Sequence, residues 1–586
     1  MASKFKTIKH EVDFCVVGGG LAGLCAAVAA ARNGIKTAIM QDRPMFGGNC
    51  SSEIRMWVCG AANGAMDTRE TGIVEELELE NCYRNPYKNH SIWDSVMYEV
   101  VRYNENIEVM LNCSCLDAEM DGNKIKTITG WQLTTQQYHE VSAKIFADCS
   151  GDSILAPLTG AEFRWGREAR SEFNESIAPE EADGRTMGMS CMLQGREFTE
   201  PRSYIAPKWA EKFTGENLYG RKPKMSNWSE NFWYIELGGM GNTIDDSEDL
   251  RDELLEIAYG MWDYVKNSGE CENTENWDLD WVGMIPGKRE SRRYIGDHIL
   301  TQNDVESEGK FDDMVAFGGW TMDDHHPMGI RYPGAPNIFH PAPDPYGIPY
   351  RVLYSKNIDN LMFAGRNISA THSALSSTRV MATCGTMGQA VGTAAAIAVK
   401  NNTNPRGVYE NHIKELKLNL MNDDCYLPFN TKEINELTLK AKFETDGKNA
   451  DVLFNGIERD MGETDNGLRG DKGTYVKFSY EKPESVKEIR FIFDSFLNRK
   501  PVGNYHHGTD ANVRLKRDPI VPPYTLVKEF DIVLTKADGT TETITVDNNY
   551  QRLVKVPVGM DVTDVKVTFK ETWGADDIHV FAVELF

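Results

Sequence analysis

The sequence predicts a mixed α/β chain that ends in an all-β sandwich. Three observations support this prediction. Residues 12–40 read as strand, glycine turn, small-residue helix and second strand. A strand that runs into another glycine turn lies more than three hundred residues later, at 360–366. After about residue 430, short segments of alternating polarity are separated by turn residues, which is typical of antiparallel sheets.

The composition alone excludes several classes of partner and site. The 586 residues are 41% hydrophobic and 26% charged, as expected for a globular chain with a large core. The 63 basic and 88 acidic residues give a net charge of −25, which disfavours nucleic acid and anionic membranes as partners. No apolar run reaches the roughly 18 residues of a membrane helix. The 12 cysteines contain no C-x-x-C pair, so neither a metal site nor a disulfide framework is expected. With no signal-peptide pattern, we expect a cytoplasmic protein.

The first unit is a strand over 12–17, a helix over 21–33 closed by Gly34, and a strand over 36–40. The turn between strand and helix reads Gly18-x-Gly20-x-x-Gly23. Gly18 makes the sharp turn, Gly20 lets a pyrophosphate approach the backbone, and Gly23 lets the helix pack against the strand. The helix N-terminus then offers unpaired N–H groups to the anion. The unit predicts a Rossmann-type dinucleotide site, and a packing role for the glycines is the alternative.

The ribose ligand is less certain from the sequence. An acidic residue is expected about 20 residues after the turn, at the end of the second strand. Gln41 occupies that place and Asp42 follows it. Either side chain can hydrogen-bond a ribose hydroxyl, so both stay candidates.

The next elements alternate between helix and strand. A loop rich in Gly, Ser and Asn covers 47–66. Helices are predicted at 68–81 and 91–103, strands at 107–111, 125–133 and 144–147, and a turn at 148–152. The middle, 160–350, is rich in Trp, Tyr, Arg and Pro and predicts an inserted α+β region. A strand over 360–364 and a long small-residue helix over 376–400 follow.

Together the opening turn, the sequence Asp-Cys-Ser-Gly-Asp at 148–152 and the later Ala-Gly-Arg turn resemble the FAD-dependent oxidoreductases of the glutathione-reductase structural type. The segments GGNCSSEIRMWVCG and AGRNISATHSALSSTRVMATCGTMGQAVGTAA are similar to its bacterial branch. The resemblance implies FAD as cofactor. It also implies an FAD-binding domain built from residues 10–160 and 351–425, with a substrate or lid domain inserted at 161–350. Small residues in the helix over 376–400 are expected to let it pass close to the flavin.

The resemblance also implies a set of cofactor-binding residues along both glycine turns and the loop between them. They are Gly18, Gly20, Leu21, Ala22, Gly23, Gln41, Asp42, Arg43, Gly48, Asn49, Ser51, Asp148, Gly151, Asp152, Gly365, Arg366, Ser377, Thr378 and Arg379. A covalent bond from Cys50 or Cys59 to the flavin is an alternative to buried free thiols.

His372 is the first candidate for the chemistry. It lies between the Ala-Gly-Arg turn and the helix, where related folds, including fumarate reductase-like flavoproteins, present a histidine to substrate. Its near-neutral pKa suits proton removal from a hydroxyl as hydride leaves. Tyr350, His340 and Arg55 are further candidates, and Arg55 lies in the loop expected under the ring.

Other polar residues of the middle region leave alternatives open. His325 and His326 were candidates for substrate contact, with a metal site as the weaker alternative, because adjacent strand residues face opposite sides. Arg289, Arg292 and Arg293 form a basic cluster that could hold a carboxylate, or could form structural ion pairs.

The C-terminal region, 430–586, predicts a β-sandwich. The sequences around 451–456, 474–478 and 572–574 resemble the galactose-binding, discoidin-like jelly roll. Such a module implies either contact with a glycan or packing against the catalytic domain. His506 and His507 are expected in a loop at one end of the sandwich.

Two enzymatic readings and one binding reading follow. The first is oxidation of a hydroxyl-bearing carbon of a carbohydrate or glycoside by hydride transfer to flavin N5. The alternative is reduction of an activated C=C bond in a small carboxylate-bearing substrate. A flavin-holding binding protein is the third. The expected partner is a small, sugar-like substrate, and the sequence leaves open whether the chain forms a homo-oligomer.

Overall fold

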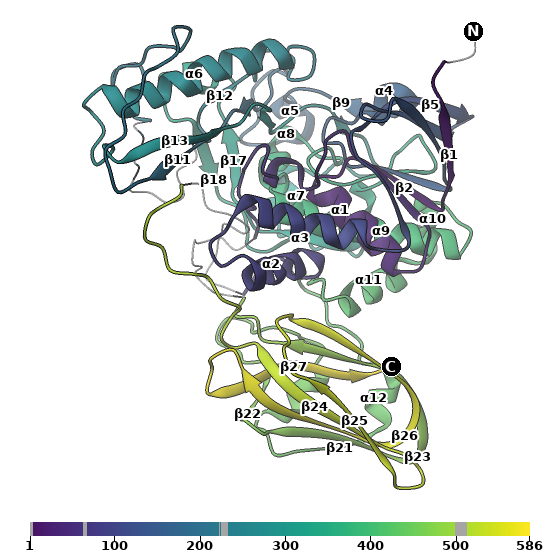
Figure 1. Ribbon diagram of the computed structural model, residues 1–586. Helices are drawn as coiled ribbons and strands as arrows, with labels where there is room; N and C mark the ends of the chain where they lie inside the picture. Colours follow the sequence, from purple (N-terminus) through teal and green to yellow (C-terminus); the bar gives the residue numbers. More distant parts are fainter. Residues whose placement is uncertain (1–3, 62–66, 222, 224, 226–231, 498–511) are drawn as a thin grey trace.

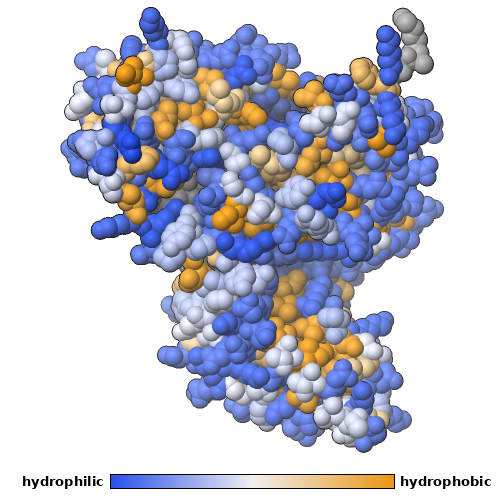
Figure 2. Space-filling view, viewed as in Figure 1, coloured by the Kyte–Doolittle hydropathy of each residue, from blue (hydrophilic) through white to orange (hydrophobic). Residues whose placement is uncertain are grey.

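The computed structural model describes residues 4–61, 67–221, 223, 225, 232–497 and 512–586. The chain forms a large mixed α/β body and a smaller β body, joined at a waist (Figures 1 and 2). His506 and His507 lie outside the described residues. Among the described helices, none combines the length and the apolar character needed to cross a membrane.

A five-stranded parallel sheet forms the centre of the large body. Its strand order is β20-β8-β2-β3-β4. The bounds are β2 Phe14–Val17, β3 Thr37–Met40, β4 Ile107–Met110, β8 Ile145–Asp148 and β20 Leu361–Phe363. Every residue of β2, β3 and β8 is buried, as expected for parallel strands covered on both faces. The chain leaves this sheet after β8 and returns to it only at β20, so the two glycine turns end neighbouring strands.

Helix α1, Leu21–Arg32, and helix α9, Met381–Lys400, pack against each other beside this sheet. A Cβ on Gly388 would lie 2.0 Å from the carbonyl oxygen of Ala22, and one on Gly392 would lie 2.1 Å from that of Ala26. These two glycines therefore let two helix backbones touch. The expectation that the small residues of this helix accommodate the flavin is wrong at these positions.

The helix predicted over 376–400 is in fact two helices. Helix α8 spans His372–Thr378, and α9 begins at Met381 after a break at Arg379 and Val380. Val380 has an extended backbone and no side chain that caps the helix. The break leaves the first N–H groups of α9 without intrahelical acceptors, beside Arg379.

The remaining elements of the first part cover the parallel sheet. The helix predicted over 68–81 begins later, as α2. The strands β1, β5 and β7 and the short helix α4 were not predicted. The elements are β1 Thr7–Glu11, α2 Ile73–Arg84, α3 His90–Arg102, β5 Cys113–Asp121, β6 Lys124–Gln132, β7 Gln137–Ser142 and α4 Leu155–Thr159. Strands β1, β7, β6 and β5 form a four-stranded sheet in that order.

The inserted region consists of short strands around one long helix, α6. Its elements are β9 Phe163–Arg164, α5 Arg170–Phe173, β10 Met189–Ser190, β11 Leu193–Glu197, β12 Glu236–Leu237, α6 Ser247–Asn267, β13 Trp277–Val282, β14 Gly287–Lys288, β15 Arg293–Tyr294, α7 Gln302–Glu306, β16 Met314–Gly318, β17 Met322–His325, β18 Asn337–His340 and β19 Tyr346–Pro349. The strands β17 and β18 pair as an antiparallel hairpin, and β17 packs against α8. After α9, helices α10 Pro405–Asn411 and α11 Ile413–Asn422 lead to the β body.

The β body is an antiparallel sandwich. Two long bulged strands, β23 and β26, pair along most of their length. Its elements are α12 Glu436–Lys440, β21 Lys442–Thr445, β22 Leu468–Asp471, β23 Tyr475–Phe493, β24 Val527–Thr535, β25 Thr541–Val546, β26 Leu553–Thr572 and β27 Asp577–Leu585. Its own core includes Phe478, Phe491, Phe530 and Phe569. Apolar side chains also gather on the face of this body that Figure 2 shows.

Candidate functional site

A cavity of about 440 Å³ lies at the carboxyl ends of the parallel strands. Gly18 and Gly20, from the turn after β2, line it together with Gly365, from the turn after β20. The two glycine turns therefore meet at one cleft, although more than three hundred residues separate them. This is the edge at which open parallel sheets bind nucleotides.

The first turn fits a pyrophosphate. Gly18 has φ +99°, and a Cβ on it would lie 2.5 Å from the backbone of Cys149. A Cβ on Gly20 would meet no atom within 4 Å and would stand in the open cleft. Gly20 caps α1 without a side chain, so the first N–H groups of that helix face the cleft unscreened. Gly23 does not line the cleft, because it faces the oxygen of Gly18, only 1.9 Å from its Cβ position.

The structure separates the two ribose candidates. Gln41 is buried, accepts a hydrogen bond from the N–H of Gly19 at 2.7 Å, and donates to the carbonyl of Met45 at 3.1 Å. Its amide therefore braces the glycine turn. Asp42 is exposed and also lines the cleft, so its carboxylate is the group available to a ribose hydroxyl.

The loop after β3 closes over the glycine turn. The N–H of Gly47 donates to the carbonyl of Gly19 at 2.8 Å, and Gly48, with φ +57°, lies against Gly20. Arg43 and Asn49 line the cleft. Ser51 does not line it, because its buried hydroxyl donates to the carbonyl of Gly48 at 2.7 Å.

The turn after β8 brings a carboxylate into the cleft, next to two cationic side chains. Asp152 lies 2.9 Å from Lys288 and 2.7 Å from Arg366, and all three line the cleft. Burial opposes ionisation of Asp152, but the two cations outweigh it and lower its pKa. Asp148 is different, because its buried carboxylate accepts from the Ser150 and Leu155 N–H groups and the Tyr294 hydroxyl. It shapes the turn and does not line the cleft.

Most of the predicted cofactor residues thus share one cleft. Those that line it are Gly18, Gly20, Leu21, Ala22, Gln41, Asp42, Arg43, Gly48, Asn49, Gly151, Asp152, Gly365, Arg366 and Arg379. Five others lie behind it: Gly23, Ser51, Asp148, Ser377 and Thr378. The hydroxyl of Ser377 is buried and bonded to the carbonyl of Trp320 and to Tyr346, and Thr378 is also fully buried.

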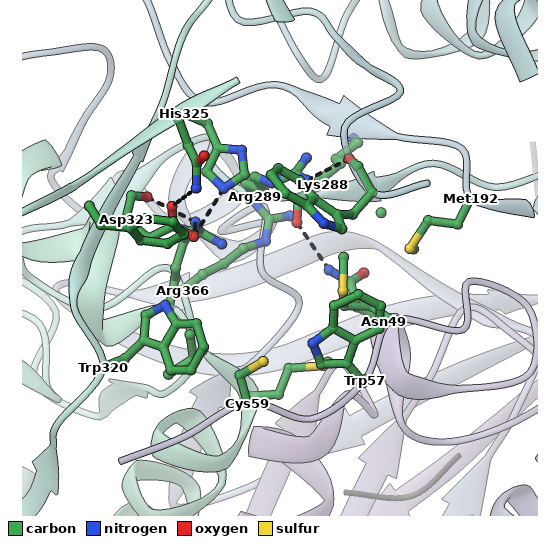
Figure 3. A pocket seen from close by; sticks show the side chains of 18 residues that line it. Asn49, Trp57, Cys59, Met192, Lys288, Arg289, Trp320, Asp323, His325 and Arg366 are labelled. Atoms are coloured by element: carbon green, nitrogen blue, oxygen red, sulfur yellow. Dashed lines mark hydrogen bonds and ion pairs between the residues drawn. The ribbon is translucent and has the colours of Figure 1, made fainter. Parts of the chain in front are cut away.

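A second cavity, of about 220 Å³, continues from this cleft. Five residues line both: Asn49, Lys288, Arg366, Arg379 and Met381. In Figure 3, Trp57 and Trp320 form one side of the second cavity. His325, Asp323, Arg289 and Lys288 form the opposite side. Trp233, Asn337 and Phe339 also line it.

Asp323 and His325 are linked in the wall of this cavity. Nε2 of His325 lies 3.1 Å from Asp323, and Nδ1 lies 2.8 Å from Glu236. Burial would raise the pKa of Asp323, but His325 and Arg379 outweigh it and lower that pKa. The ring of His325 therefore lies between two carboxylates in the cavity wall.

His372 lies outside both cavities and is held differently from what the sequence suggested. Its Nδ1 lies 2.8 Å from Glu290 and its Nε2 3.2 Å from Asp324. Burial alone would lower its pKa, but these carboxylates raise it to about 10. Carboxylates thus hold both ring nitrogens and favour the protonated ring. In this geometry His372 does not offer the free nitrogen that the predicted catalytic base requires.

The other three catalytic candidates also lie outside both cavities. Tyr350 is fully buried, and its hydroxyl donates to the carbonyl of Pro405 at 3.1 Å. His340 pairs with Met322 in the β17-β18 hairpin, one residue beyond Phe339. Arg55 donates to Gln194, lies 4.3 Å from the ring centre of Trp281, and has its pKa lowered to about 10 by burial. We interpret these three as structural.

Sequence reasoning missed most of the second cavity. Trp57, Trp233, Trp320 and Asp323 were not singled out, although Trp57 lies within the quoted loop segment. The sequence indicates His325 and Arg289 only as members of clusters. A Trp-rich middle region was the available signal, and only the folded hairpin shows which of its residues meet.

One further group of side chains has the spacing of metal ligands. Within the described ranges it is Asp460, Asp465 and His579, in the sandwich. His579 contacts Asp465 at 3.1 Å and Asp494 at 3.0 Å, so these carboxylates already bind its ring. The histidine therefore serves as the partner of the carboxylates, and no cation is needed to explain the cluster.

Comparison with known proteins adds three findings. No curated protein matches the sequence. Similar solved structures include the family 32 carbohydrate-binding module of Streptococcus pneumoniae EndoD, with 12% identity over 25% of this chain and 97% of that one, at a TM-score of 0.19. The lectin domain of lectinolysin has 14% identity over 26% and 97%, at 0.19. The C. perfringens NanJ module has 9% over 25% and 94%, at 0.17. Scores this low carry no argument about the fold or ligand of this chain.

The match to a protein family is more extensive. The family described as "FAD dependent oxidoreductase" matches residues 13–420. That stretch contains both glycine turns and every residue that lines the two cavities. The cleft, its uncapped helix terminus and this match agree, and the chain belongs to the FAD dependent oxidoreductase family.

Proposed function

We propose that this FAD-dependent enzyme oxidises a hydroxyl-bearing carbon of a carbohydrate-type substrate. The observation that carries the proposal is a cavity walled by three tryptophans and by hydrogen-bonding side chains that opens onto the dinucleotide cleft. Indole rings pack against the C–H faces of a sugar ring, while carboxylates and amides bind its hydroxyls. FAD, when bound, supplies the hydride-accepting centre.

The cleft residues have distinct tasks in this proposal. The N–H groups at the start of α1 and the open backbone of Gly20 hold the pyrophosphate. The carboxylate of Asp42 binds ribose. Asn49, whose amide donates to the carbonyl of Lys288 at 3.1 Å, fixes the boundary between the cofactor cleft and the substrate cavity.

Asp323 and His325 form the acid–base unit of the substrate cavity in this proposal. The proton between Nε2 of His325 and the Asp323 carboxylate lies in the cavity wall, where a substrate hydroxyl would bind. Asn337 donates to the other oxygen of Asp323 and orients it. Asp323, whose carboxylate can accept a proton, therefore takes the role that the sequence had suggested for His372, and His325 orients it.

Anaerobic mixing of the FAD-loaded protein with a panel of glycosides tests the proposal. We expect bleaching of the oxidised flavin absorbance by at least one glycoside. Asp323→Asn and His325→Gln should each keep bound FAD but slow the bleaching by about 100-fold, the usual scale of acid–base assistance. His412→Gln, which affects an ion pair with Glu415 away from both cavities, is the matched control. If no glycoside bleaches the flavin, the carbohydrate assignment is wrong.

One observation favours a second candidate function. Four cationic side chains, Lys288, Arg289, Arg366 and Arg379, line the substrate cavity. Such a wall also suits a small unsaturated acid, whose C=C bond would be reduced. In that case chemically reduced protein should be reoxidised by unsaturated carboxylic acids, and glycosides should leave the oxidised flavin unchanged.

A further inference from the structure

We propose that the substrate carries a carboxylate, which Arg379 and Trp320 hold where the two cavities meet. The inference rests on the proposed function and narrows its substrate class to acidic carbohydrates, such as uronic acids. Two independent observations support it: an excess of positive charge in the cavity wall, and two buried hydrogen-bond donors that find no acceptor among the described residues.

The charge count begins with the four cations of the wall. Lys288 and Arg366 share Asp152, Arg379 is paired with Asp323, and Arg289 lies 3.5 Å from Glu236. Four cations thus face three carboxylates. His325 contacts two of those same carboxylates, Glu236 and Asp323, so they are not available to the arginines alone. A protein of net charge −25 therefore concentrates positive charge at this one cavity.

Arg289 is not the source of the unpaired positive charge in the cavity wall. Its guanidinium donates to the Ser190 hydroxyl at 2.9 Å and to the carbonyl of Trp233 at 3.1 Å, and it is buried. These protein acceptors, together with Glu236, occupy its N–H groups. Its role is to support the wall.

Arg379 and Trp320 each have a buried N–H group for which the described residues provide no acceptor. Nε of Arg379 and Nε1 of Trp320 are buried, and neither has a hydrogen-bond partner among the described residues. The ion pair of Arg379 with Asp323 uses a different nitrogen, Nη2, which lies 3.2 Å from Oδ2 of Asp323. In Figure 3 the indole nitrogen of Trp320 is on the edge of the ring that faces Asp323 and Arg366. Both groups can only donate, so an acceptor on a ligand or a water molecule would complete their hydrogen bonds.

A carboxylate meets this requirement better than a hydroxyl. It only accepts, offers about four lone-pair sites, and forms its strongest hydrogen bonds with cationic donors. Trp320 lines the substrate cavity and not the dinucleotide cleft, so its N–H is directed to substrate. Arg379 lines both cavities and precedes the N-terminus of α9, which no side chain caps and which adds positive potential at the same place.

Binding of two matched sugars tests the proposal without turnover. Full-length protein loaded with FAD is reduced with dithionite under anaerobic conditions, so that neither sugar can be oxidised. Calorimetric titration with D-glucuronate and D-glucose then gives two dissociation constants. We expect D-glucuronate to bind at least about tenfold more tightly, the effect of one charged hydrogen bond. Equal constants for the two sugars would overturn the proposal.

Two variants locate the carboxylate. Arg379→Gln should remove the preference for D-glucuronate, and Trp320→Phe, which keeps an aromatic ring without the N–H, should reduce that preference several-fold. Arg406→Gln, in an ion pair with Asp297 away from both cavities, is the control. If both cavity variants keep the full preference, the assignment is wrong. If Arg379→Gln fails to retain FAD, Trp320→Phe decides alone.

A third probe separates this proposal from the proposed function. Succinate carries carboxylates but no sugar ring. If succinate binds in an Arg379-dependent way while both sugars fail to bind, the carboxylate site stands and the carbohydrate assignment falls. If D-glucose and D-glucuronate bind with the same affinity, the carbohydrate assignment stands and the carboxylate site falls.

Discussion

His372 shows how two carboxylates change what a histidine can do. Glu290 and Asp324 hold both ring nitrogens, and they outweigh burial, so the pKa rises from 6.5 to about 10. A group whose pKa is raised on folding stabilises the folded state while it is protonated. The stabilisation is complete below about pH 6.5 and is lost as the pH rises towards 10. His372 is thus an electrostatic anchor behind the substrate cavity.

We therefore expect the effect of His372→Gln to depend on pH. The variant should unfold at a lower temperature than wild type at pH 6, and the difference should shrink steadily as the pH is raised to 10. Each unit of pKa shift corresponds to about 1.4 kcal/mol, so the effect is large enough to measure. Thermal unfolding of both proteins at a series of pH values gives the result. A difference that stays constant from pH 6 to 10 would show that His372 is not charged in the folded protein.

The contact between α1 and α9 depends on glycines that lie outside the glycine motif at 18–23. Gly23 packs α1 against its strand, while Gly388 and Gly392 pack α9 against α1. Through this contact the first turn of α1, which faces the pyrophosphate site, is fixed relative to the first turn of α9, which lies where the cavities meet. The cofactor and substrate sites therefore share one helix pair.

Gly388→Ala tests this contact. Its new methyl group would lie 2.0 Å from a backbone oxygen of α1, so the helices must separate. We expect destabilisation of about 1–3 kcal/mol, the usual effect of overpacking, together with weaker FAD retention. Gly184→Ala, where a Cβ meets no atom within 4 Å, is the control. Chemical denaturation and gel filtration of the yellow protein provide both readouts. Wild-type stability of the Gly388 variant would mean that this helix contact is loose.

Sequence patterns predicted local elements better than their partners. The strand, turn and helix around Gly18 and Gly20 are confirmed because turn geometry and helix capping depend on neighbouring residues. Gly388 was expected beside the flavin but lies beside α1. A small residue in a helix indicates a close neighbour without identifying it. Asp323 was missed because the β17-β18 hairpin and β12 come together only in the folded chain. Short strands such as β7 were missed because their polarity does not alternate clearly.

At the scale of the whole molecule, the sandwich is packed firmly onto the catalytic body. Tyr83 of α2 stacks on Tyr550 with ring centres 4.0 Å apart, and the amide of Asn548 donates to the Tyr83 hydroxyl at 2.8 Å. The segment before β24 also reaches the inserted region, where the N–H of Val513 donates to the carbonyl of Gly195 in β11 at 3.0 Å. The sandwich thus supports both the helices and the substrate region. This favours an interface role for it, the second of the two roles that the jelly-roll resemblance implied.

Arg459 of the sandwich is the side chain that we expect to couple the two bodies. It is buried, donates to the carbonyl of Asp67 at 2.6 Å and to the Thr71 hydroxyl at 3.2 Å, and lies 3.8 Å from the ring centre of Tyr426. The segment that it holds includes Glu70, which accepts from the hydroxyl of Thr383 in α9 at 2.8 Å. A displacement of the sandwich would therefore reach the helix whose first turn lines both cavities.

Arg459→Gln should loosen this connection. Loss of charged hydrogen bonds to buried acceptors is expected to destabilise the protein by about 1.5–3 kcal/mol and to release FAD at a lower temperature. Flavin fluorescence, which rises when the cofactor leaves the protein, would report the release during heating. Arg469→Gln is the control, because its ion pairs with Asp465 and Asp577 lie within the sandwich. If Arg459→Gln destabilises the sandwich but FAD is released at the wild-type temperature, the two bodies are joined without being coupled, and the sandwich has no part in holding the cofactor site.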